Sequence, residues 1–270
     1  MRRIGRFAFS WSLLGLTLAG APATADAAST STSSNWAGYA VTRTSSAGGF
    51  HSVSGSWVVP SGDCSTSSPA YSATWVGLGG LTEQSRALEQ TGTEFDCSAD
   101  GSASYSAWYE LVPAAGRTIP MTVRPGDTID ASVTVRATHV TLLLRNRTRH
   151  ATFRRTFTMS DPDVSSAEWI VEAPSDCNGD GRCVQLPLSD FGTATFRRAY
   201  ATGSGGRRAA AGWSAWSLTR IELSGGDSPR FGYADTALAA GATPSDLAGG
   251  GNSFSVSYDA TRSQTSPSSA

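Results

Sequence analysis

The chain contains no lysine: its 21 basic residues are all arginine, against 22 acidic residues in a sequence of 270. Charged residues make up only 16% of the chain. No basic run indicates nucleic acid as a partner, and no acidic tail indicates a strongly charged one. So few charges also mean little mutual repulsion when carboxylates take up protons, which suits a protein that works in acid.

Common motifs of metal and serine hydrolases are missing. The sequence has no HExxH, and its three histidines, His51, His139 and His150, lack the spacing of zinc ligands. It has no GxSxG, the motif around many nucleophilic serines. The segment DCNGDG at 176–181 begins like a calcium loop, but Pro187 stands where that loop needs a glutamate. We therefore read this segment as a turn and expect neither metal nor cofactor.

Apart from the N-terminus, no apolar run is long enough to cross a membrane. Arg2, Arg3 and Arg6 precede a mostly apolar stretch at 7–18, and small residues with A-x-A spacing follow it. This order is typical of a secretory signal peptide, and the apolar stretch is too short for a permanent membrane span. We predict a signal peptide at 1–27 and a secreted protein that does not associate with membranes.

Long helical periodicity is also absent. Short runs of β-branched and aromatic residues alternate with polar ones and are separated by Gly, Pro, Ser and Asp, a pattern typical of an antiparallel β-sandwich. We expect a flexible Ser/Thr-rich segment at 28–34, a single all-β domain at 35–260 and a disordered tail at 261–270. We also expect a monomer.

Four cysteines in a secreted chain indicate two disulfides. Cys177 and Cys183 flank a group of turn residues, which favours a bond between them and leaves Cys64 to pair with Cys97. Four cysteines allow three connectivities, so this pairing is a hypothesis.

Three strand-like segments carry acid or amide groups among apolar neighbours: LEQTG at 88–92, AWYEL at 107–111 and AEWIVE at 167–172. Such groups are costly on buried strand faces unless they are paired or used. In AEWIVE, Glu168 and Glu172 share one face but lie about 13 Å apart along the strand. They therefore cannot act as a contacting pair, and one of them needs a partner from another strand.

These segments, with SNWAGY at 34–39 and TWVG at 74–77, resemble the glutamic peptidase (eqolisin) family over nearly the whole mature chain. The resemblance implies a curved antiparallel β-sandwich, similar to legume-lectin-like sandwiches. It also implies an acid-active endopeptidase whose catalytic pair is Gln90 and Glu172, which are 82 residues apart. The stretch from Trp75 to Gln90 is one residue longer than in the fungal pattern and lacks its cysteine, as expected of a bacterial branch.

The same resemblance implies that Trp75, Glu94, Trp108 and Glu110 line a cleft for polypeptide substrates. The two tryptophans would suit core packing equally well. Glu94 stands where the family usually has aspartate, and Leu-Val-Pro at 111–113 follows AWYE where aromatic residues are frequent in the family. Substrate preference is therefore expected to differ.

The chemistry expected of this pair follows from its two groups. An ionised Glu172 would take a proton from water, and the Gln90 amide would orient that water and donate to the developing oxyanion. Glu172 would then return the proton to the leaving amine. With a Glu172 pKa near its ordinary value, activity would peak in acid and be absent at neutral pH.

Two other functions fit the same composition. A glycoside hydrolase on a similar sandwich would use two of Glu110, Glu168 and Glu172, with their carboxylates about 5–9.5 Å apart. A carbohydrate-binding module would use surface tryptophans without catalysis. A glutamine opposite Glu172 with no second carboxylate in reach would argue against the glycoside hydrolase. An ordered, buried pair of glutamine and glutamate at a cleft would argue against the binding module.

Overall fold

The computed structural model describes residues 28–43, 48–66, 68–82, 84–177, 183–224 and 240–260. The predicted signal peptide, the predicted tail and most of the calcium-like segment lie outside these ranges. The described residues form strands and turns without any helix, so they contain no helix that could cross a membrane. The prediction of an all-β fold is confirmed.

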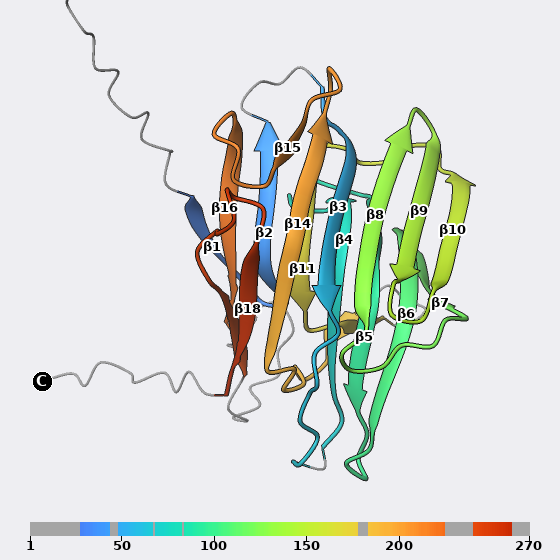
Figure 1. Ribbon diagram of the computed structural model, residues 1–270, viewed down its shortest axis with the longest axis vertical. Coiled ribbons are helices and arrows are strands. Elements are labelled where there is room, and N and C mark those ends of the chain that lie inside the picture. The colour runs from blue at the N-terminus through green and yellow to red at the C-terminus, as the bar shows by residue number, and fades with distance from the viewer. Residues whose placement is uncertain are drawn as a thin grey trace, which may run out of the picture.

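The described residues contain eighteen strands, which Figure 1 draws in their arrangement. In chain order they are β1 (Ser29–Ser33), β2 (Trp36–Arg43), β3 (Phe50–Val58), β4 (Ala70–Gly79), β5 (Leu88–Cys97), β6 (Ala103–Val112), β7 (Ala114–Ile119), β8 (Thr128–Arg136), β9 (His139–Asn146), β10 (Ala151–Thr158), β11 (Ser166–Glu172), β12 (Ser175–Cys177), β13 (Cys183–Gln185), β14 (Thr193–Gly203), β15 (Arg208–Ala210), β16 (Trp216–Leu223), β17 (Gly241–Pro244) and β18 (Phe254–Asp259).

Sixteen of these strands form one continuous sheet that folds into two layers, and β12 and β13 form a separate two-stranded sheet. Hydrogen bonding runs in the order β10-β9-β8-β3-β14-β18-β17-β16-β2-β11-β4-β5-β6-β7. Figure 1 shows β14, β3, β8, β9 and β10 in front of β2, β11, β4, β5 and β6, with the path turning back through β18 and β16. All ladders along this path are antiparallel. The predicted antiparallel sandwich is therefore confirmed.

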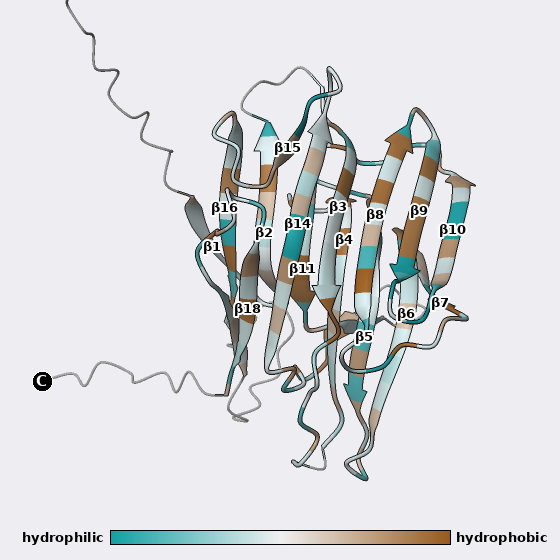
Figure 2. Cartoon of the chain, in the orientation of Figure 1, coloured by the Kyte–Doolittle hydropathy of each residue, from teal (hydrophilic) through white to brown (hydrophobic). Residues whose placement is uncertain are grey.

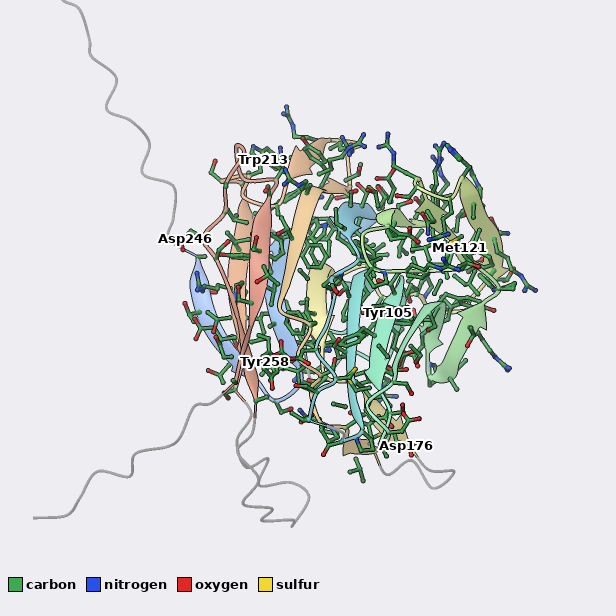
Figure 3. All side chains as sticks on the ribbon, turned by 60° about the horizontal axis from the view of Figure 1, so that its bottom comes forward. Tyr105, Met121, Asp176, Trp213, Asp246 and Tyr258 are labelled. Atoms are coloured by element: carbon green, nitrogen blue, oxygen red, sulfur yellow. A yellow bond between two sulfur atoms is a disulfide. The ribbon has the colours of Figure 1, made fainter. Side chains whose placement is uncertain are left out.

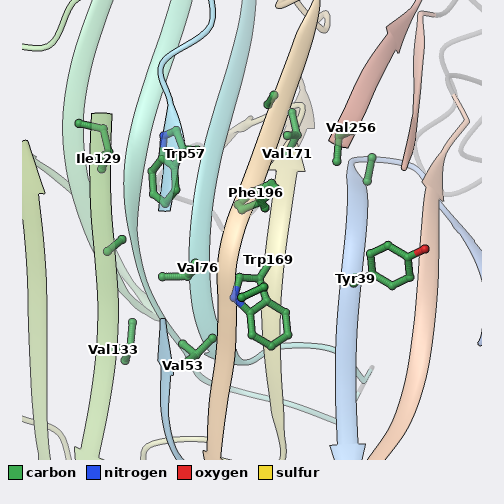
Figure 4. Packing of buried hydrophobic residues seen from close by; sticks show 14 of the residues in the cluster. Tyr39, Val53, Trp57, Val76, Ile129, Val133, Trp169, Val171, Phe196 and Val256 are labelled. Atoms are coloured by element: carbon green, nitrogen blue, oxygen red, sulfur yellow. The ribbon is translucent and has the colours of Figure 1, made fainter. Parts of the chain in front are cut away.

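The main core lies between the two layers, and two tryptophans connect them (Figure 4). Trp169 of β11 donates its indole N–H to the Ser54 carbonyl of β3 at 2.8 Å. Trp57 of β3 donates to the Thr93 hydroxyl of β5 at 3.0 Å. Both rings are fully buried, and each N–H has the partner that a buried donor needs. Figure 2 shows the matching alternation of apolar and polar bands along the front strands.

The segment at 28–34 differs from the prediction that it is flexible. Ser29–Ser33 form strand β1, which pairs in parallel with β16. The sequence STSTS has no apolar side chain to signal a strand. An edge strand needs only backbone partners, which β16 supplies along its whole length.

One disulfide joins Cys64 to Cys97, as predicted, and fixes the loop after β3 to the end of β5. Cys183 is also disulfide-bonded. Cys177 lies directly opposite it in the β12–β13 ladder, which is the register that the predicted pair requires. This hairpin follows β11 directly and lies at one end of the sandwich, where Figure 3 labels Asp176.

Candidate active site

The outer face of the layer β2-β11-β4-β5-β6 carries most of the predicted site residues. Opposed residues of neighbouring strands share a face, so the register decides which side chains lie together. Glu172 opposes Ala73 of β4, and Gln90 opposes Gly77 of the same strand. Positions 73 and 77 have the same parity, so Glu172 and Gln90 lie on one face, four residues apart along β4. Trp75 stands between them.

Glu172 ends β11 in a ring of N–H donors. The Trp75 indole donates to one carboxylate oxygen at 2.8 Å, and the Asn35 amide donates to the other at 3.0 Å. Burial raises the pKa of Glu172 to about 7; hydrogen bonds from Trp75, Trp36 and Asn35 oppose this rise, and the nearby Glu110 charge adds to it. The side chain is half-buried, so it is held firmly and remains open to solvent.

This pKa corrects the sequence-based premise of a Glu172 with an ordinary value. Apolar neighbours on the outer face, among them Trp36, Trp75 and Ile170, remove solvent from the carboxyl and disfavour its charged form. The ionised fraction of Glu172 falls about tenfold for each pH unit below its pKa. If Glu172 is the base, its working range moves upward from strong acid toward neutrality.

Gln90 is paired with Glu110 of β6, its direct neighbour across the ladder. The Gln90 amide nitrogen donates to the Glu110 carboxylate at 2.8 Å. A carboxylate only accepts hydrogen bonds, so this contact decides which end of the amide is nitrogen. The Gln90 amide oxygen is buried and has no hydrogen-bond partner among the described residues. An unpaired buried carbonyl oxygen is costly, so a water or a substrate group that reached this oxygen would gain a hydrogen bond.

The other predicted cleft residues also lie on this face. Glu94 opposes Ala73, in the cross-strand row of Glu172, and accepts a hydrogen bond from Ser106 at 3.3 Å. Burial raises its pKa. Trp108 is half-buried and packs at the edge of the apolar cluster that holds Trp75. Trp75 is fully buried and packs in this cluster, which is the core packing that the sequence allowed equally well, while its indole N–H bonds Glu172; its lining of a substrate cleft stays a prediction.

Glu168 lies on the same face but is sealed from solvent. It is fully buried, and neither of its carboxylate oxygens has a hydrogen-bond partner among the described residues. Burial raises its pKa well above the usual range, and the charges of Asp163 and Glu89 add to this. The register places Glu168 in the cross-strand row of Gln90, yet a sealed carboxyl cannot touch a substrate. Of the two glutamates of AEWIVE, Glu172 is the accessible one.

Asn35 is the site residue that sequence reasoning missed. It lies just before β2, and its amide reaches Glu172 across 137 positions of sequence. The SNWAGY motif marked the segment without assigning this contact. A polar residue beside a half-buried tryptophan was the available signal.

A cavity of about 770 Å³ lies elsewhere, near the ends of β2 and β4. Its lining includes Arg43, Arg86, Asp161 and Asp163, and none of the predicted site residues. It therefore plays no part in the arrangement of Glu172 and Gln90.

The site geometry bears differently on the two alternative functions, a glycoside hydrolase and a carbohydrate-binding module. Glu110 is close enough to raise the pKa of Glu172, so carboxylate placement alone does not separate a peptidase from a glycoside hydrolase. The ordered contact between Gln90 and Glu110 does argue against a simple binding module, because such a module needs no oriented amide. Comparison with known proteins decides between the first two.

The fold and this face together define a class: two-layered β-sandwiches with a glutamate and a glutamine on the outer face of one layer. The model of the Peptidase A4 family matches residues 34–229. The chain therefore belongs to the Peptidase A4 family, in which the solved structures below are glutamic peptidases.

Three relatives illustrate the similarity. Aspergillopepsin-2 of Aspergillus niger is 34% identical over 198 residues, which are 64% of this chain and 66% of that protein. Scytalido-glutamic peptidase, solved with a peptide-based transition-state analogue, is 27% identical with a TM-score of 0.64. SCP-B, an eqolisin solved with the tripeptide Ala-Ile-His, is 27% identical with a TM-score of 0.60. Each of these two matches covers 83% of this chain and 98% of the other.

Proposed function

We propose that the protein is a secreted endopeptidase of the bacterial branch of its family, active in mildly acidic solution, and that Glu172 and Gln90 hydrolyse the peptide bond. The observation that carries this proposal is the held Glu172 carboxylate on the same face as an amide oriented by Glu110. The family resemblance supplies the substrate class, polypeptides, and the two relatives solved with peptide ligands support it.

The reaction runs through two proton transfers. Ionised Glu172 accepts a proton from the attacking water. Gln90 lies four residues, or about 13 Å, away along β4, so its amide acts on the same reaction only through water and substrate bound between the two side chains. The water oxygen bonds to the scissile carbonyl carbon, and the second amide N–H of Gln90 stabilises the oxyanion. Glu172 then gives its proton to the leaving nitrogen, and the C–N bond breaks. A base with a pKa of about 7 is stronger than an ordinary glutamate, which favours the first transfer.

Peptide cleavage itself is the first test. Purified mature protein should cleave casein at internal bonds between about pH 5 and 7, in the presence of a strong chelator and after treatment with a serine-directed reagent. Mass spectrometry of the fragments identifies the cleaved bonds. Loss of cleavage with the chelator would contradict the mechanism, and release of sugars from polysaccharides without peptide cleavage would favour the glycosidase.

Glu110 has a positioning role in this scheme, and Glu110→Gln tests it. A glutamine at 110 no longer fixes the Gln90 amide, so we expect kcat to fall about tenfold or more while KM changes little. Removing the Glu110 charge also lowers the pKa of Glu172, so the rising limb of the pH profile should move to lower pH.

Asp96→Asn is the matched control for Glu110→Gln. Asp96 lies on the same face of β5, six residues from Gln90, and its pKa is also raised, to about 7, by burial and by Glu94. Asp96→Asn should leave both kcat and the rising limb of the pH profile unchanged. If the rising limb of the pH profile stays at the same pH in Glu110→Gln, then Glu110 does not act on Glu172 and has no place in the proposed site.

A further inference from the structure

The outer face of the opposite layer carries exposed arginines among hydroxyl groups. Side chains alternate along each strand, so the neighbours of inward-facing Val133 and Leu142 point to solvent. We call this surface the arginine face. It consists of the outward sides of β10, β9, β8, β3, β14 and β15, which form the front of Figure 1. It lies on the far side of the sandwich from Glu172.

The arginines are spread across the whole arginine face. Arg145 of β9 opposes Asp130, which opposes Ser56, which in turn opposes Arg197 of β14. Arg154 lies one strand further out, on β10. From β10 to β15 the face is five strand spacings wide, or about 24 Å. A surface of this width suits an extended ligand better than a small ion.

Charge on these six strands is almost entirely positive. They contain seven arginines and a single acidic residue, Asp130; six of the arginines are on the outward side, since Arg155 opposes the inward-facing Leu142. Asp130 accepts long contacts from Arg147 at 3.6 Å and Arg198 at 3.9 Å. Exposed pairs at such distances neutralise little charge. The face therefore keeps a large positive excess, although the whole chain has a formal net charge of only −1.

The groups between the arginines are mostly hydroxyls. Ser52 donates to the Thr202 hydroxyl at 3.0 Å, and Arg208 donates to the Ser54 hydroxyl at 3.4 Å. Hydroxyl and guanidinium groups are the side chains that bind phosphate oxygens. Guanidinium groups also stay protonated at every pH that the protein can meet, so acid does not weaken this surface.

The one aromatic ring on this stretch is not free to stack on bases. The Arg208 guanidinium lies over the Tyr200 ring at 4.0 Å from its centroid. Single-stranded nucleic acids are usually bound by open aromatic rings, and duplexes by elements that enter a groove. A sheet face with a covered ring offers neither, so it fits the charges of a polymer backbone.

We propose that the arginine face binds a linear phosphate polymer without nucleobases in the extracellular surroundings and so holds the protein on an anionic surface. Each phosphate of such a polymer keeps one charge in acid, whereas polymers of carboxylic acids lose theirs. This choice of phosphate rests on the acidic working range proposed above. The candidate site faces away from the arginine face, so a bound polymer leaves it open to substrate.

Binding of fluorescently labelled linear polyphosphate at pH 5.5 tests this proposal. Fluorescence anisotropy should show binding by the wild type that weakens by ~10-fold or more between 50 and 200 mM salt, as charge-driven binding does. The double variant Arg145→Gln/Arg197→Gln should bind at least about tenfold more weakly, with a salt slope reduced by about 2. Arg86→Gln/Arg124→Gln removes the same charge from exposed sites elsewhere and should bind like the wild type.

Three results would overturn the proposal: no binding at 50 mM salt, equal losses in the two double variants, or tighter binding to duplex DNA than to polyphosphate. Equal losses would show that net charge alone matters, and preference for DNA would show a nucleic-acid surface. Cleavage of a short soluble peptide, measured on the same samples, should be unchanged in both variants. This readout separates failure of the arginine face from failure of the proposed peptidase.

Discussion

Glu172→Gln and Gln90→Ala are each expected to lower kcat for peptide hydrolysis by ~10²–10⁴-fold, the usual cost of losing a general base or an oxyanion donor. Glutamine at 172 keeps the shape of the side chain that accepts from Trp75 and Asn35, but it cannot take a proton from water. Alanine at 90 removes the amide that orients the water. Initial rates on an internally quenched peptide measure both effects.

The control for this loss is the other glutamate of the motif. Glu168→Gln alters a carboxyl of the same strand and face, but one sealed from solvent. It should retain most of the wild-type kcat at pH 6. Thermal unfolding of each variant shows whether it is folded. A folded Glu172→Gln with near wild-type rates, beside an inactive Glu168→Gln, would mean that the reacting carboxyl is Glu168.

The second large effect expected is a loss of stability as the pH rises. Burial raises the pKa of Glu89 to about 8, that of Asp96 to about 7 and that of Glu168 well above its usual range. In each case the folded state holds its proton more tightly than the unfolded chain does. Their stabilising effect is complete below the unfolded pKa near 4 and is lost as the pH rises through the folded values. Unfolding should therefore become easier between pH 4.5 and pH 8.

The size of this effect is open to measurement. Each unit of pKa shift corresponds to ~1.4 kcal/mol, so several such groups should lower Tm by about 10 °C or more between pH 4.5 and pH 8. Glu168→Gln removes one ionisable group, so its Tm should exceed that of the wild type at pH 8 and differ less at pH 4.5. Calorimetry at the two pH values decides this. A wild-type Tm that rises toward pH 8 would contradict the raised pKa values.

Below pH 4.5 the pH dependence of stability is expected to come from a different group, Asp127. Asp127 accepts hydrogen bonds from Asn146 and Arg149, and these hold its pKa below the ordinary value despite burial. Its contribution to stability is present above the unfolded pKa and is lost as the pH falls through the folded one. The protein should therefore be most stable in mildly acidic solution, in the range proposed for catalysis.

The sequence predicted the sandwich because alternation is a local signal. Strands such as β8 (TIDASVTVR) place every second side chain in the core, and the pattern is visible without any partner. Strand β1 (STSTS) carries no such signal, since its backbone pairs at an edge and its side chains are almost all exposed. The order of the strands in the sheet depends on contacts between distant segments and could not be read in the same way.

For the candidate site, the motifs indicated Glu172 and Gln90 and a likeness to a family, and the roles of these two residues stay predictions. The parity of AEWIVE placed Glu168 and Glu172 on one face, which the register of β11 with β4 confirms. The pKa of Glu172 could not be predicted, because it depends on Trp36, Trp75 and Glu110, which other strands bring to it. The contact from Asn35 depends likewise on the pairing of β2 with β11.

The pH dependence of kcat/KM, measured from pH 4 to 8 on a quenched peptide with folding checked at each point, tests most directly whether Glu172 is the general base. If it is, the rate rises with one ionisation toward the Glu172 pKa of about 7 and then falls as the fold weakens. The residual activity of Glu172→Gln should lack that ionisation. A rising limb at the same pH in Glu172→Gln would show that another group carries the proton, and would contradict the account.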